Sequence, residues 1–345
     1  MRERIERLQA KLEEPLLVTT PANVTYLTGF VSSNAALFVE PDSVRLFTDF
    51  RYAETARKVP DVEFIEARRD TIKHIAELLS GTVGFESTQL TYRNWEILRE
   101  GGLELVPRVS LVETLRAVKD ADELGRIRHA AEITAQAFEK LAGEKFVGRT
   151  ERELAWRMDE LFHELGADAP AFETIVAAGP NGAIPHADPG DREIGANTTV
   201  VIDAGAAVDG YCSDCTRTFA TGSLPDDLGR AYDVCLEGQL AGLEVARAGV
   251  KGVDADKASR LVINEAGFGD KFGHGLGHGV GIDVHEAPRL AQTSTDTLAA
   301  GNVVTIEPGI YLAGTGGIRI EDLVVVTDGD PEILSGFTKE LVTVS

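Results

Sequence analysis

Four carboxylates, Asp203, Asp214, Glu307 and Glu321, stand in strand-like and largely apolar stretches of the second half of the chain. Asp203, for example, directly follows three β-branched apolar residues. An unpaired carboxylate in such a setting is costly to bury, so a positive charge is expected beside it. Carboxylates are ligands for divalent cations, and two ions about 4 Å apart lower the pKa of bound water while polarising a carbonyl. The pattern therefore predicts hydrolytic metal chemistry.

The Asp209-Gly210 dipeptide predicts how the first two carboxylates meet. Asp-Gly between two β-type runs is the strongest short signal for a hairpin. If these two residues form the turn, Asp203 faces Thr216, and Asp214 lies diagonal to Asp203 on the same face. A three-residue loop would instead place the two aspartates on opposite faces.

A second hairpin and a glycine-rich run supply the other candidate ligands. Glycines 314, 316 and 317 are expected to form the turn between the runs that carry Glu307 and Glu321. Three of the seven histidines, His274, His278 and His285, fall between the two hairpins, interleaved with glycines that let the backbone approach a ligand closely. Carboxylates with one or two imidazoles suit Mn²⁺, Co²⁺, Fe²⁺ or Zn²⁺ rather than a structural cysteine–zinc site.

Long helices and short strands must position these residues. Helices are predicted to begin at Asp120, which forms a capping-box pattern with Glu123, and at Thr150, which forms one with Glu153. Two more helices are predicted over residues 226–248 and 254–266. Such runs of helices and strands are typical of an α+β domain, in which helices cover one face of an antiparallel sheet. We expect this domain to span residues 119–345.

The first half is organised differently. Short apolar runs alternate with helical patterns; the runs are at 16–20, 35–39, 44–48, 62–65 and 82–85, and the helical patterns at 51–59, 71–79 and 92–100. This alternation predicts an α/β domain with a mixed sheet over residues 1–118. A length of 345 residues suits two domains.

Composition excludes several classes of protein. The chain carries 34 basic against 56 acidic residues, a formal net charge of −22, and no polybasic block. A phosphate backbone or an anionic membrane surface would be repelled, so no nucleic-acid or membrane partner is expected. No segment reaches the roughly 18 apolar residues of a transmembrane helix, and residues 1–14 predict an amphipathic helix rather than a signal peptide. Three cysteines suit a reducing cytoplasm.

Several of these residues also have ordinary structural interpretations. His274 could be a hydrogen-bonded structural histidine, and His186 could be a solvated residue in a loop rich in proline and glycine. The Cys212–Cys215 pair fits a CxxC pattern, but residues three apart on an extended strand point to opposite faces. We expect both cysteines to be packing residues.

Together the motifs resemble the pita-bread metallopeptidases, the family of methionine aminopeptidase, aminopeptidase P and prolidase. The resemblance rests on the Asp-x₁₀-Asp hairpin, His-Gly-Leu-Gly-His-Gly-Val-Gly-Ile-Asp-Val-His-Glu, Ile-Glu-Pro-Gly-Ile-Tyr and Gly-Ile-Arg-Ile-Glu-Asp, which occur in the family's order from roughly residue 120 onward. It implies a metal-ligand set of Asp203, Asp214, His278, Glu307 and Glu321. In this family Asp214 and Glu321 would bridge both ions, Asp203 would hold one, and His278 and Glu307 the other.

The resemblance also implies roles for the neighbouring residues. A hydroxide bridging the two metals would be the nucleophile, and Glu307 would carry a proton to the leaving nitrogen. His285 would stabilise the tetrahedral oxyanion, and His186 would lie near the scissile bond. Arg319 would orient an acidic ligand, and His274 would line the substrate pocket.

The first half of the chain narrows the choice among the branches of this family. Residues 23–30 and 48–52 resemble the creatinase-like N-terminal domain that aminopeptidase P and prolidase carry and methionine aminopeptidase normally lacks. Creatine amidinohydrolase shares the two-domain build but does not keep the five ligands. The resemblance therefore implies a homodimeric Xaa-Pro aminopeptidase that cuts the bond before proline in peptides, with two divalent ions, manganese first and cobalt, zinc or iron as alternatives.

Three other functions stay open from the sequence. An Xaa-Pro dipeptidase uses the same metal chemistry but must also recognise the free carboxylate of its substrate, through a cation or a helix N-terminus. A metallo-amidase would keep the metals and act on a non-peptide substrate. A pita-bread domain used as a binding scaffold would hold no metal, and such scaffolds have lost ligands that this sequence keeps.

Overall fold

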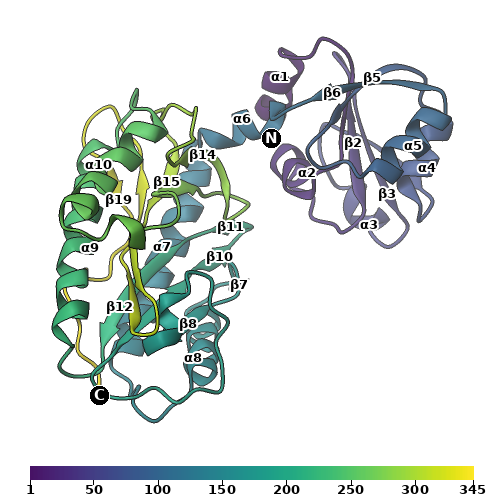
Figure 1. Ribbon diagram of the computed structural model, residues 1–345. Coiled ribbons are helices and arrows are strands. Elements are labelled where there is room, and N and C mark those ends of the chain that lie inside the picture. The colour runs from purple at the N-terminus through teal and green to yellow at the C-terminus, as the bar shows by residue number, and fades with distance from the viewer. The chain divides into compact units, whose positions relative to one another are not determined.

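The chain divides after Arg116 in the computed structural model, which describes all residues from 1 to 345. The first unit is Met1–Arg116 and the second unit is Ala117–Ser345 (Figure 1). The boundary expected after residue 118 lies two residues later and stays a prediction. No helix in either unit combines the length and the apolar character that a membrane crossing requires.

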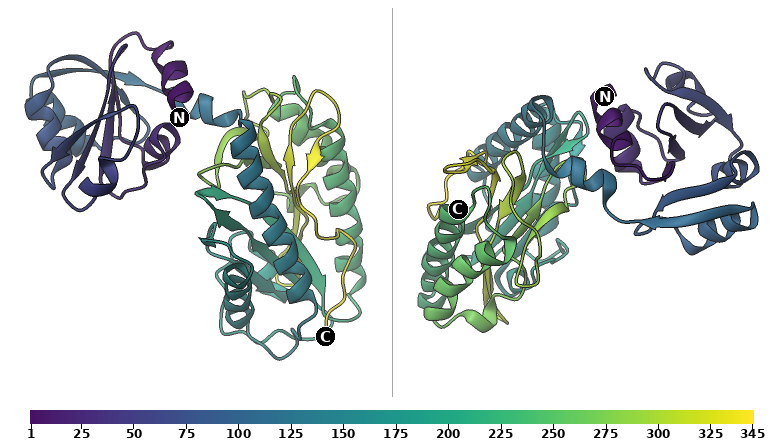
Figure 2. Two further views of the ribbon diagram at one scale, coloured as in Figure 1. Left: turned by 180° about the vertical axis from the view of Figure 1, so that it is seen from behind. Right: turned by 90° about the horizontal axis from the view of Figure 1, so that it is seen from above.

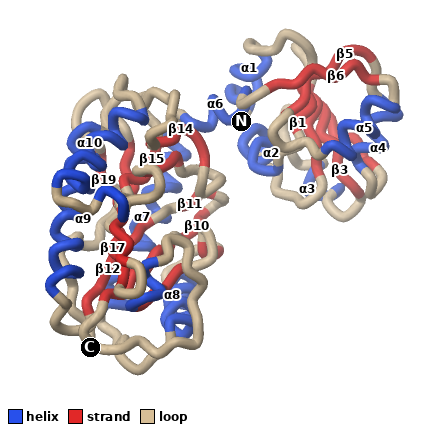
Figure 3. The backbone as a smooth tube through the Cα atoms, in the orientation of Figure 1, coloured by secondary structure: helices blue, strands red, loops and turns tan.

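The first unit is built on one six-stranded mixed sheet. Its strand order is β4-β3-β2-β1-β5-β6, with β1–β5, β5–β6 and β3–β4 parallel and the other pairs antiparallel. Figure 3 shows α4 and α5 running side by side along these strands. The elements are α1 Arg2–Gln9, β1 Leu16–Val18, α2 Pro21–Thr28, β2 Ala35–Val39, β3 Val44–Asp49, α3 Ala53–Ala56, β4 Glu63–Ala67, α4 Thr71–Leu78, β5 Gly81–Glu86, α5 Tyr92–Glu100, β6 Leu103–Arg108 and α6 Leu111–Ala117.

The mixed sheet confirms the predicted α/β class. The sequence analysis missed three elements of this unit. It did not predict α2, β6 or α6. Helix α2 is short and almost wholly buried, so its sequence shows no amphipathic period. The one local signal for this helix is Pro21 in its first turn, a position where proline is common. Helix α3 is also shorter than the helical pattern over residues 51–59 predicted.

The second unit is an α+β fold whose strand ladders are all antiparallel. Its ladders have the orders β12-β9-β8, β11-β10-β7, β14-β13-β15-β18-β19 and β16-β17. The helices are α7 Ala121–Ala142, α8 Glu151–Glu164, α9 Asp226–Val245 and α10 Gly252–Glu265, with short 3₁₀ turns η1 Gly179–Ala183 and η2 Gly269–Lys271. The strands are β7 Ala169–Pro170, β8 Ile175–Ala178, β9 Thr199–Ala204, β10 Ala206–Val208, β11 Tyr211–Cys212, β12 Cys215–Ala220, β13 Gly277–Gly279, β14 Glu286–Leu290, β15 Val303–Ile306, β16 Gly309–Leu312, β17 Gly316–Arg319, β18 Asp322–Val325 and β19 Glu332–Ile333.

Two pairs of helices cover the strands through separate apolar cores. Helices α7 and α8 pack on β8, β9 and β12, and Figure 2 shows α7 lying across the strands of this unit. Helices α9 and α10 pack on β14, β15 and β18. The two predicted capping boxes are present, with Asp120 and Glu123 starting α7 and Thr150 and Glu153 starting α8. Each helix therefore begins where its local signal predicts.

The first hairpin has the predicted register and an interruption in its middle. Asp203 pairs with Thr216, and Asp209 and Gly210 form the turn with φ of 49° and 78°, as expected for an Asp-Gly turn. The ladder breaks at Gly205 on one strand and before Cys215 on the other. A Cβ at Gly205 would lie 1.9 Å from Ser213 O, so only glycine permits this close approach.

The second hairpin is interrupted in the same way. Its outer ladder joins β15 to β18 and ends at the Ile306–Asp322 pair, and its inner ladder joins β16 to β17 and begins at the Gly309–Arg319 pair. Glu307 and Glu321 both fall in the gap between the two ladders. The two predicted carboxylates of this hairpin therefore occupy its break.

The expectation that three glycines form the turn of this hairpin is wrong for two of them. Only Gly314 lies in the turn, with φ of 78°. Gly316 and Gly317 belong to β17. A Cβ at Gly317 would lie 1.8 Å from Gly182 O, so this glycine serves close packing of the backbone against η1 rather than a turn.

The break in the first hairpin generates a test. Gly205→Ala is expected to destabilise the second unit by about 1–3 kcal/mol, the range of overpacked sites, because the new methyl group meets Ser213 O. Equilibrium unfolding in urea measures the loss. Gly229→Ala is the control, because a Cβ there meets nothing within 4 Å in helix α9, and it should be neutral or stabilising. Equal stability of the two variants would contradict the close approach at Gly205.

Candidate metal centre

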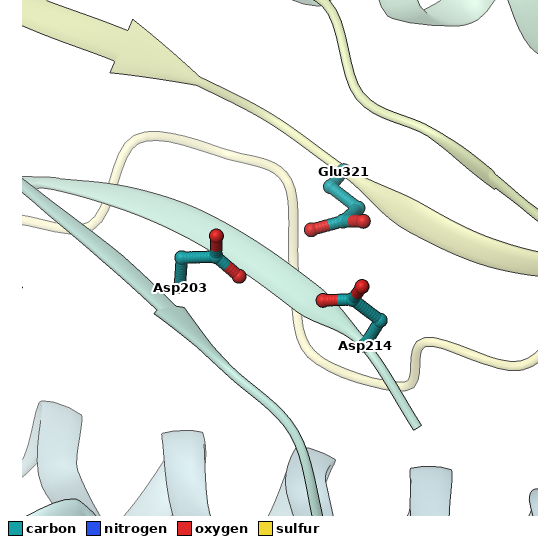
Figure 4. Close-up of side chains that lie close together, drawn as sticks. All are labelled: Asp203, Asp214 and Glu321. Carbon is teal, nitrogen blue, oxygen red and sulfur yellow. The ribbon is translucent and has the colours of Figure 1, made fainter. Parts of the chain in front are cut away.

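Three carboxylates converge between the two broken hairpins. Asp203 comes from β9, Asp214 from the break between β11 and β12, and Glu321 from the break between β17 and β18. One ligand oxygen of each lies within 4.8 Å of the others. Figure 4 shows the three side chains pointing toward one another. Asp214 is 5% exposed and Glu321 is 1% exposed, so the cluster is buried.

Two oxygens of this cluster have no partner in the protein. Asp203 Oδ1 and Glu321 Oε1 are buried without a hydrogen bond. The other oxygen of each carboxylate is held, because Arg319 Nη2 donates to Asp203 Oδ2 at 2.8 Å and Thr216 Oγ1 donates to Glu321 Oε2 at 2.7 Å. Buried polar atoms are nearly always paired, so the two free oxygens call for a cation. The residues present therefore fit a divalent metal ion.

The protonation of the cluster supports the same interpretation. Burial raises the pKa of Asp214 well above its ordinary value, and the charges of Glu321, Asp203 and Glu307 raise it further. Burial likewise raises the pKa of Glu321, with the charges of Glu307 and Asp203 adding to the effect. Each carboxylate is thus difficult to ionise beside the others without a cation.

His278 and Glu307 extend the cluster on one side. His278 Nε2 lies 3.2 Å from Glu307 Oε1 and 3.7 Å from Asp214 Oδ2. The Nδ1 atom of His278 is 3.0 Å from Gly279 O, and since a carbonyl only accepts, Nδ1 carries the proton. Nε2 therefore faces the carboxylates, where it donates to Glu307 in the metal-free protein and would bind a metal ion once deprotonated. All five predicted ligands thus lie together, and their role as ligands stays a prediction.

Glu307 differs from the two carboxylates with raised pKa values. Burial alone would raise its pKa, but the hydrogen bond and charge of His278, with the charges of His274 and Arg319, lower it to about 2. The pKa of His278 is correspondingly raised, because the Glu307 contacts outweigh burial. Glu307 is therefore ionised across the physiological pH range.

Two more predicted histidines lie near the cluster. The His285 ring centroid is 4.2 Å from that of His278. Burial lowers the pKa of His285, and the charge of His278 lowers it further, so His285 is neutral at pH 7. His186 is exposed, and it is near enough for its charge to lower the pKa of both His274 and His285. His186 thus lies within electrostatic range of the other two histidines predicted to contact substrate.

Arg319 and Tyr311 connect His274 to the carboxylates. Arg319 is buried and donates to Asp203 Oδ2 at 2.8 Å, to Tyr311 Oη at 3.0 Å and to Pro185 O at 3.1 Å. Tyr311 Oη is 2.9 Å from His274 Nε2. The predicted contact between Arg319 and an acidic ligand is present, and the same guanidinium also fixes the segment that leads into His186.

Sequence reasoning missed three polar residues of this site. Tyr311 was quoted within a motif without a role, and Thr216 and Thr305 were not singled out as site residues. Thr305 Oγ1 donates to Glu307 Oε1 at 3.1 Å, and Thr216 accepts from Arg319 while donating to Glu321. Each threonine lies two residues from a predicted ligand on the same chain, so strand alternation would have found both.

The two cysteines of the CxxC pattern occupy different environments. Cys212 and Cys215 are both buried, and neither forms a disulfide. They belong to separate apolar clusters, so the expectation that they are packing residues and not a chelating pair is confirmed.

Comparison with known proteins identifies the family. Residues 125–328 match metallopeptidase family M24, and residues 4–118 match the creatinase/prolidase N-terminal domain. The chain belongs to metallopeptidase family M24, in the branch that contains aminopeptidase P and prolidase. It is therefore a metalloexopeptidase with an N-terminal creatinase-like domain and a C-terminal pita-bread domain, and its family implies divalent metal ions.

Three relatives illustrate the extent of the similarity. The chain is 35% identical over 354 residues to an Xaa-Pro dipeptidase from Pyrococcus furiosus, covering 99% of this chain and 100% of that protein. An Xaa-Pro dipeptidase from Bacillus anthracis has a similar structure, with a TM-score of 0.95, 34% identity and 99% coverage of both chains. An X-Pro aminopeptidase from Thermotoga maritima gives a TM-score of 0.87 and 32% identity, covering 96% of this chain and 97% of that one.

The repulsion within the carboxylate cluster generates a second test. Because the pKa of Asp214 is raised in the folded protein, the metal-free protein loses stability as pH rises above about 4 toward that raised value. Asp214→Asn removes this repulsion. At pH 7 and with chelator present, the variant should melt above the wild type by at least about 2–4 °C, the shift that 1 kcal/mol produces in a domain of this size.

Adding Mn²⁺ should reverse that order. The metal should raise the melting temperature of the wild type and leave that of Asp214→Asn nearly unchanged, because the variant lacks one charged ligand. Thermal unfolding at pH 5 to 8, with and without Mn²⁺, measures both effects. A metal-free wild type as stable as the variant at every pH would refute the role assigned to the repulsion.

Proposed function

We propose that this metallopeptidase is an Xaa-Pro dipeptidase, which hydrolyses the peptide bond before the proline of a dipeptide. The carboxylate cluster with two unpartnered buried oxygens supports the metal-dependent hydrolysis. The similarity over the whole chain to the P. furiosus and B. anthracis proteins supports the dipeptide substrate. The sequence analysis put the Xaa-Pro aminopeptidase first, and these relatives are the reason for reversing that order.

The proposal places two divalent metal ions at the cluster, with manganese first and cobalt, zinc or iron as alternatives. Their ligands would be Asp203, Asp214, His278, Glu307 and Glu321. Ions bound there would supply a carbonyl-polarising charge and a water of lowered pKa. The surrounding side chains would transfer the proton and bind the substrate.

Glu307 is suited to moving a proton. Its Oε1 accepts from Thr305 and faces His278, so Oε2 is the oxygen left to take a proton from the attacking water. The leaving group is the proline nitrogen, a tertiary amide without its own N–H, so it must be protonated as the bond breaks. Glu307 would deliver that proton.

The histidines would bind and polarise the substrate. His285 is neutral at pH 7 and would donate a hydrogen bond to the oxygen that becomes negative in the tetrahedral intermediate. His274 Nδ1 is 2.8 Å from Gly275 O, so its Nε2 accepts from Tyr311 Oη and the ring is held at one edge of the pocket. His186, on an exposed loop, would close over the scissile bond from the other edge.

A dipeptidase also needs a cation for the free carboxylate of proline, and Arg289 is our candidate. Arg289 lies in β14, four residues beyond His285, and both residues are exposed, while Pro288 and Leu290 on either side of Arg289 are buried. Arg289 forms no ion pair with any acidic residue of the chain, so its charge is available to a ligand.

The cysteines and the N-terminal domain support two further parts of the proposal. Three buried cysteines, none of which forms a disulfide, suit a reducing cytoplasm. The creatinase-like domain supports a homodimer, because this extra domain helps to build the dimer in the proline-specific branch. We also retain residues 1–118 and 119–345 as the two domains.

Substrate length decides between the two peptidases. Metal-stripped protein is assayed on Xaa-Pro and Xaa-Pro-Yaa before and after adding Mn²⁺, Co²⁺ or Zn²⁺, with Asp214→Ala as the blank. We expect metal-dependent cleavage of the dipeptide and little of the tripeptide. The opposite preference would establish an aminopeptidase. If the metal-loaded protein cleaves neither peptide, the metallo-amidase with a non-peptide substrate is the function that remains.

Arg289→Ala tests the source of that preference. It should raise KM for Xaa-Pro at least about tenfold, since the loss of one charged contact to a carboxylate costs over 1.4 kcal/mol, and it should leave metal content unchanged. Lys257→Ala removes one exposed positive charge from α10 and is the matched control. Equal KM values for the two variants would rule out Arg289 as the carboxylate-binding residue.

A further inference from the structure

The segment that carries His274 is packed at its two ends, where Phe272 and Leu276 are buried in apolar clusters, and is rich in glycine between them. It runs from Phe272 to Leu276 between η2 and β13, and two of its five residues are glycines. A Cβ at Gly273 would meet nothing within 4 Å, so this part of the segment has open space around it. Glycines give the backbone conformational freedom, so something else must fix the position of His274.

A forked ion pair on α10 faces this segment. Arg260 Nε donates to Asp256 Oδ2 and Arg260 Nη2 donates to Asp256 Oδ1, both at 2.8 Å. The two residues are one helical turn apart, Asp256 is 1% exposed, and the Arg260 side chain is 11% exposed. This bidentate geometry holds the guanidinium in a single plane and leaves N–H groups directed away from the helix.

The free N–H groups of Arg260 and one oxygen of Asp256 bind the backbone of every second residue in the His274 segment. Arg260 Nη1 donates to Phe272 O at 2.8 Å, and Nη2 donates to His274 O at 2.7 Å. Leu276 N donates to Asp256 Oδ1 at 3.1 Å. The guanidinium carbon also lies 4.0 Å from the centroid of the Phe272 ring, within cation–π range. One ion pair thus fixes three alternate positions of a glycine-rich segment.

We propose that Asp256 and Arg260 are positioning residues for substrate binding, which act through the backbone of residues 272–276 to hold the His274 ring. This inference rests on the proposed function, because it gives His274 a place in the substrate pocket. The held backbone directs His274 Nε2 to Tyr311 Oη, and Tyr311 in turn binds Arg319 and so reaches Asp203. A displacement of about 1 Å at such a group can lower the rate a hundredfold.

The alternative is that the ion pair only stabilises the fold, and a double-mutant cycle separates the two roles. Arg260→Lys keeps the charge but cannot form the fork or bind both carbonyls. We expect it to lower kcat/KM for Xaa-Pro about ten- to hundredfold at unchanged metal content. In the His274→Ala background the same substitution should change kcat/KM less than twofold, while lowering the melting temperature as much as in the wild type.

A matched control tests whether the loss of activity depends on contact with residues 272–276. Arg230 lies on α9, donates to Ala266 O at 2.6 Å and stacks over Phe268, so it resembles Arg260 in chemistry but does not contact residues 272–276. Arg230→Lys should leave kcat/KM unchanged. If Arg260→Lys fails to fold, Asp256→Asn replaces it, because this variant keeps an oxygen for Leu276 N–H but loses the ionic fork.

Two outcomes overturn the proposal: an Arg260→Lys enzyme as active as Arg230→Lys, or losses from Arg260→Lys and His274→Ala that simply multiply. Hydrogen–deuterium exchange provides a readout independent of activity. Amides of residues 273–278 should exchange faster in Arg260→Lys, with the rest of α10 unchanged. If the wild type cleaves no Xaa-Pro substrate, the proposed function fails, while the exchange experiment still decides whether the ion pair holds the segment.

Discussion

Repulsion between buried carboxylates is the constraint on which the second unit depends. Asp203, Asp214 and Glu321 bring ligand oxygens within 4.8 Å of one another in a place from which water is largely excluded. Such a group raises its own pKa values and destabilises the fold unless a cation is present. The surrounding structure must therefore hold the carboxylates against their repulsion, which Arg319 and Thr216 do by binding the outer oxygens and leaving the inner ones free.

Both hairpins hold their carboxylates in the same way, through a break in the strand pairing. A continuous ladder would alternate side chains between faces and would hold the backbone in regular pairing. Each hairpin instead breaks in its middle, at Gly205 and Asp214 in one and at Glu307 and Glu321 in the other. The breaks free the chain to turn the carboxylates inward from both sides. Outside the breaks the strands pair normally and pack against two separate pairs of helices.

Local signals account for what the sequence predicted, and distant contacts for what it did not. The Asp209-Gly210 turn determines the register that sets Asp203 opposite Thr216, and two capping boxes place the starts of α7 and α8, because each signal acts within a few residues. The hydrogen bonds of Tyr311 to His274 and of Arg260 to the His274 segment join distant positions that no local pattern relates. Elements α2, β6 and α6 were missed because they are short and their form depends on tertiary packing.

The environment divides the carboxylates of one site into two chemical kinds. Asp214 and Glu321 have raised pKa values because burial and neighbouring charges oppose their ionisation. Glu307 is equally enclosed, yet its pKa is about 2 because His278 donates to it and the charges of His274 and Arg319 lie near. Pairs of titratable groups with pKa values driven apart distinguish an acid–base residue from its neighbours. His278 therefore does more than complete a ligand set, since its contact keeps Glu307 ionised while burial and neighbouring charges raise the pKa of Asp214 and Glu321.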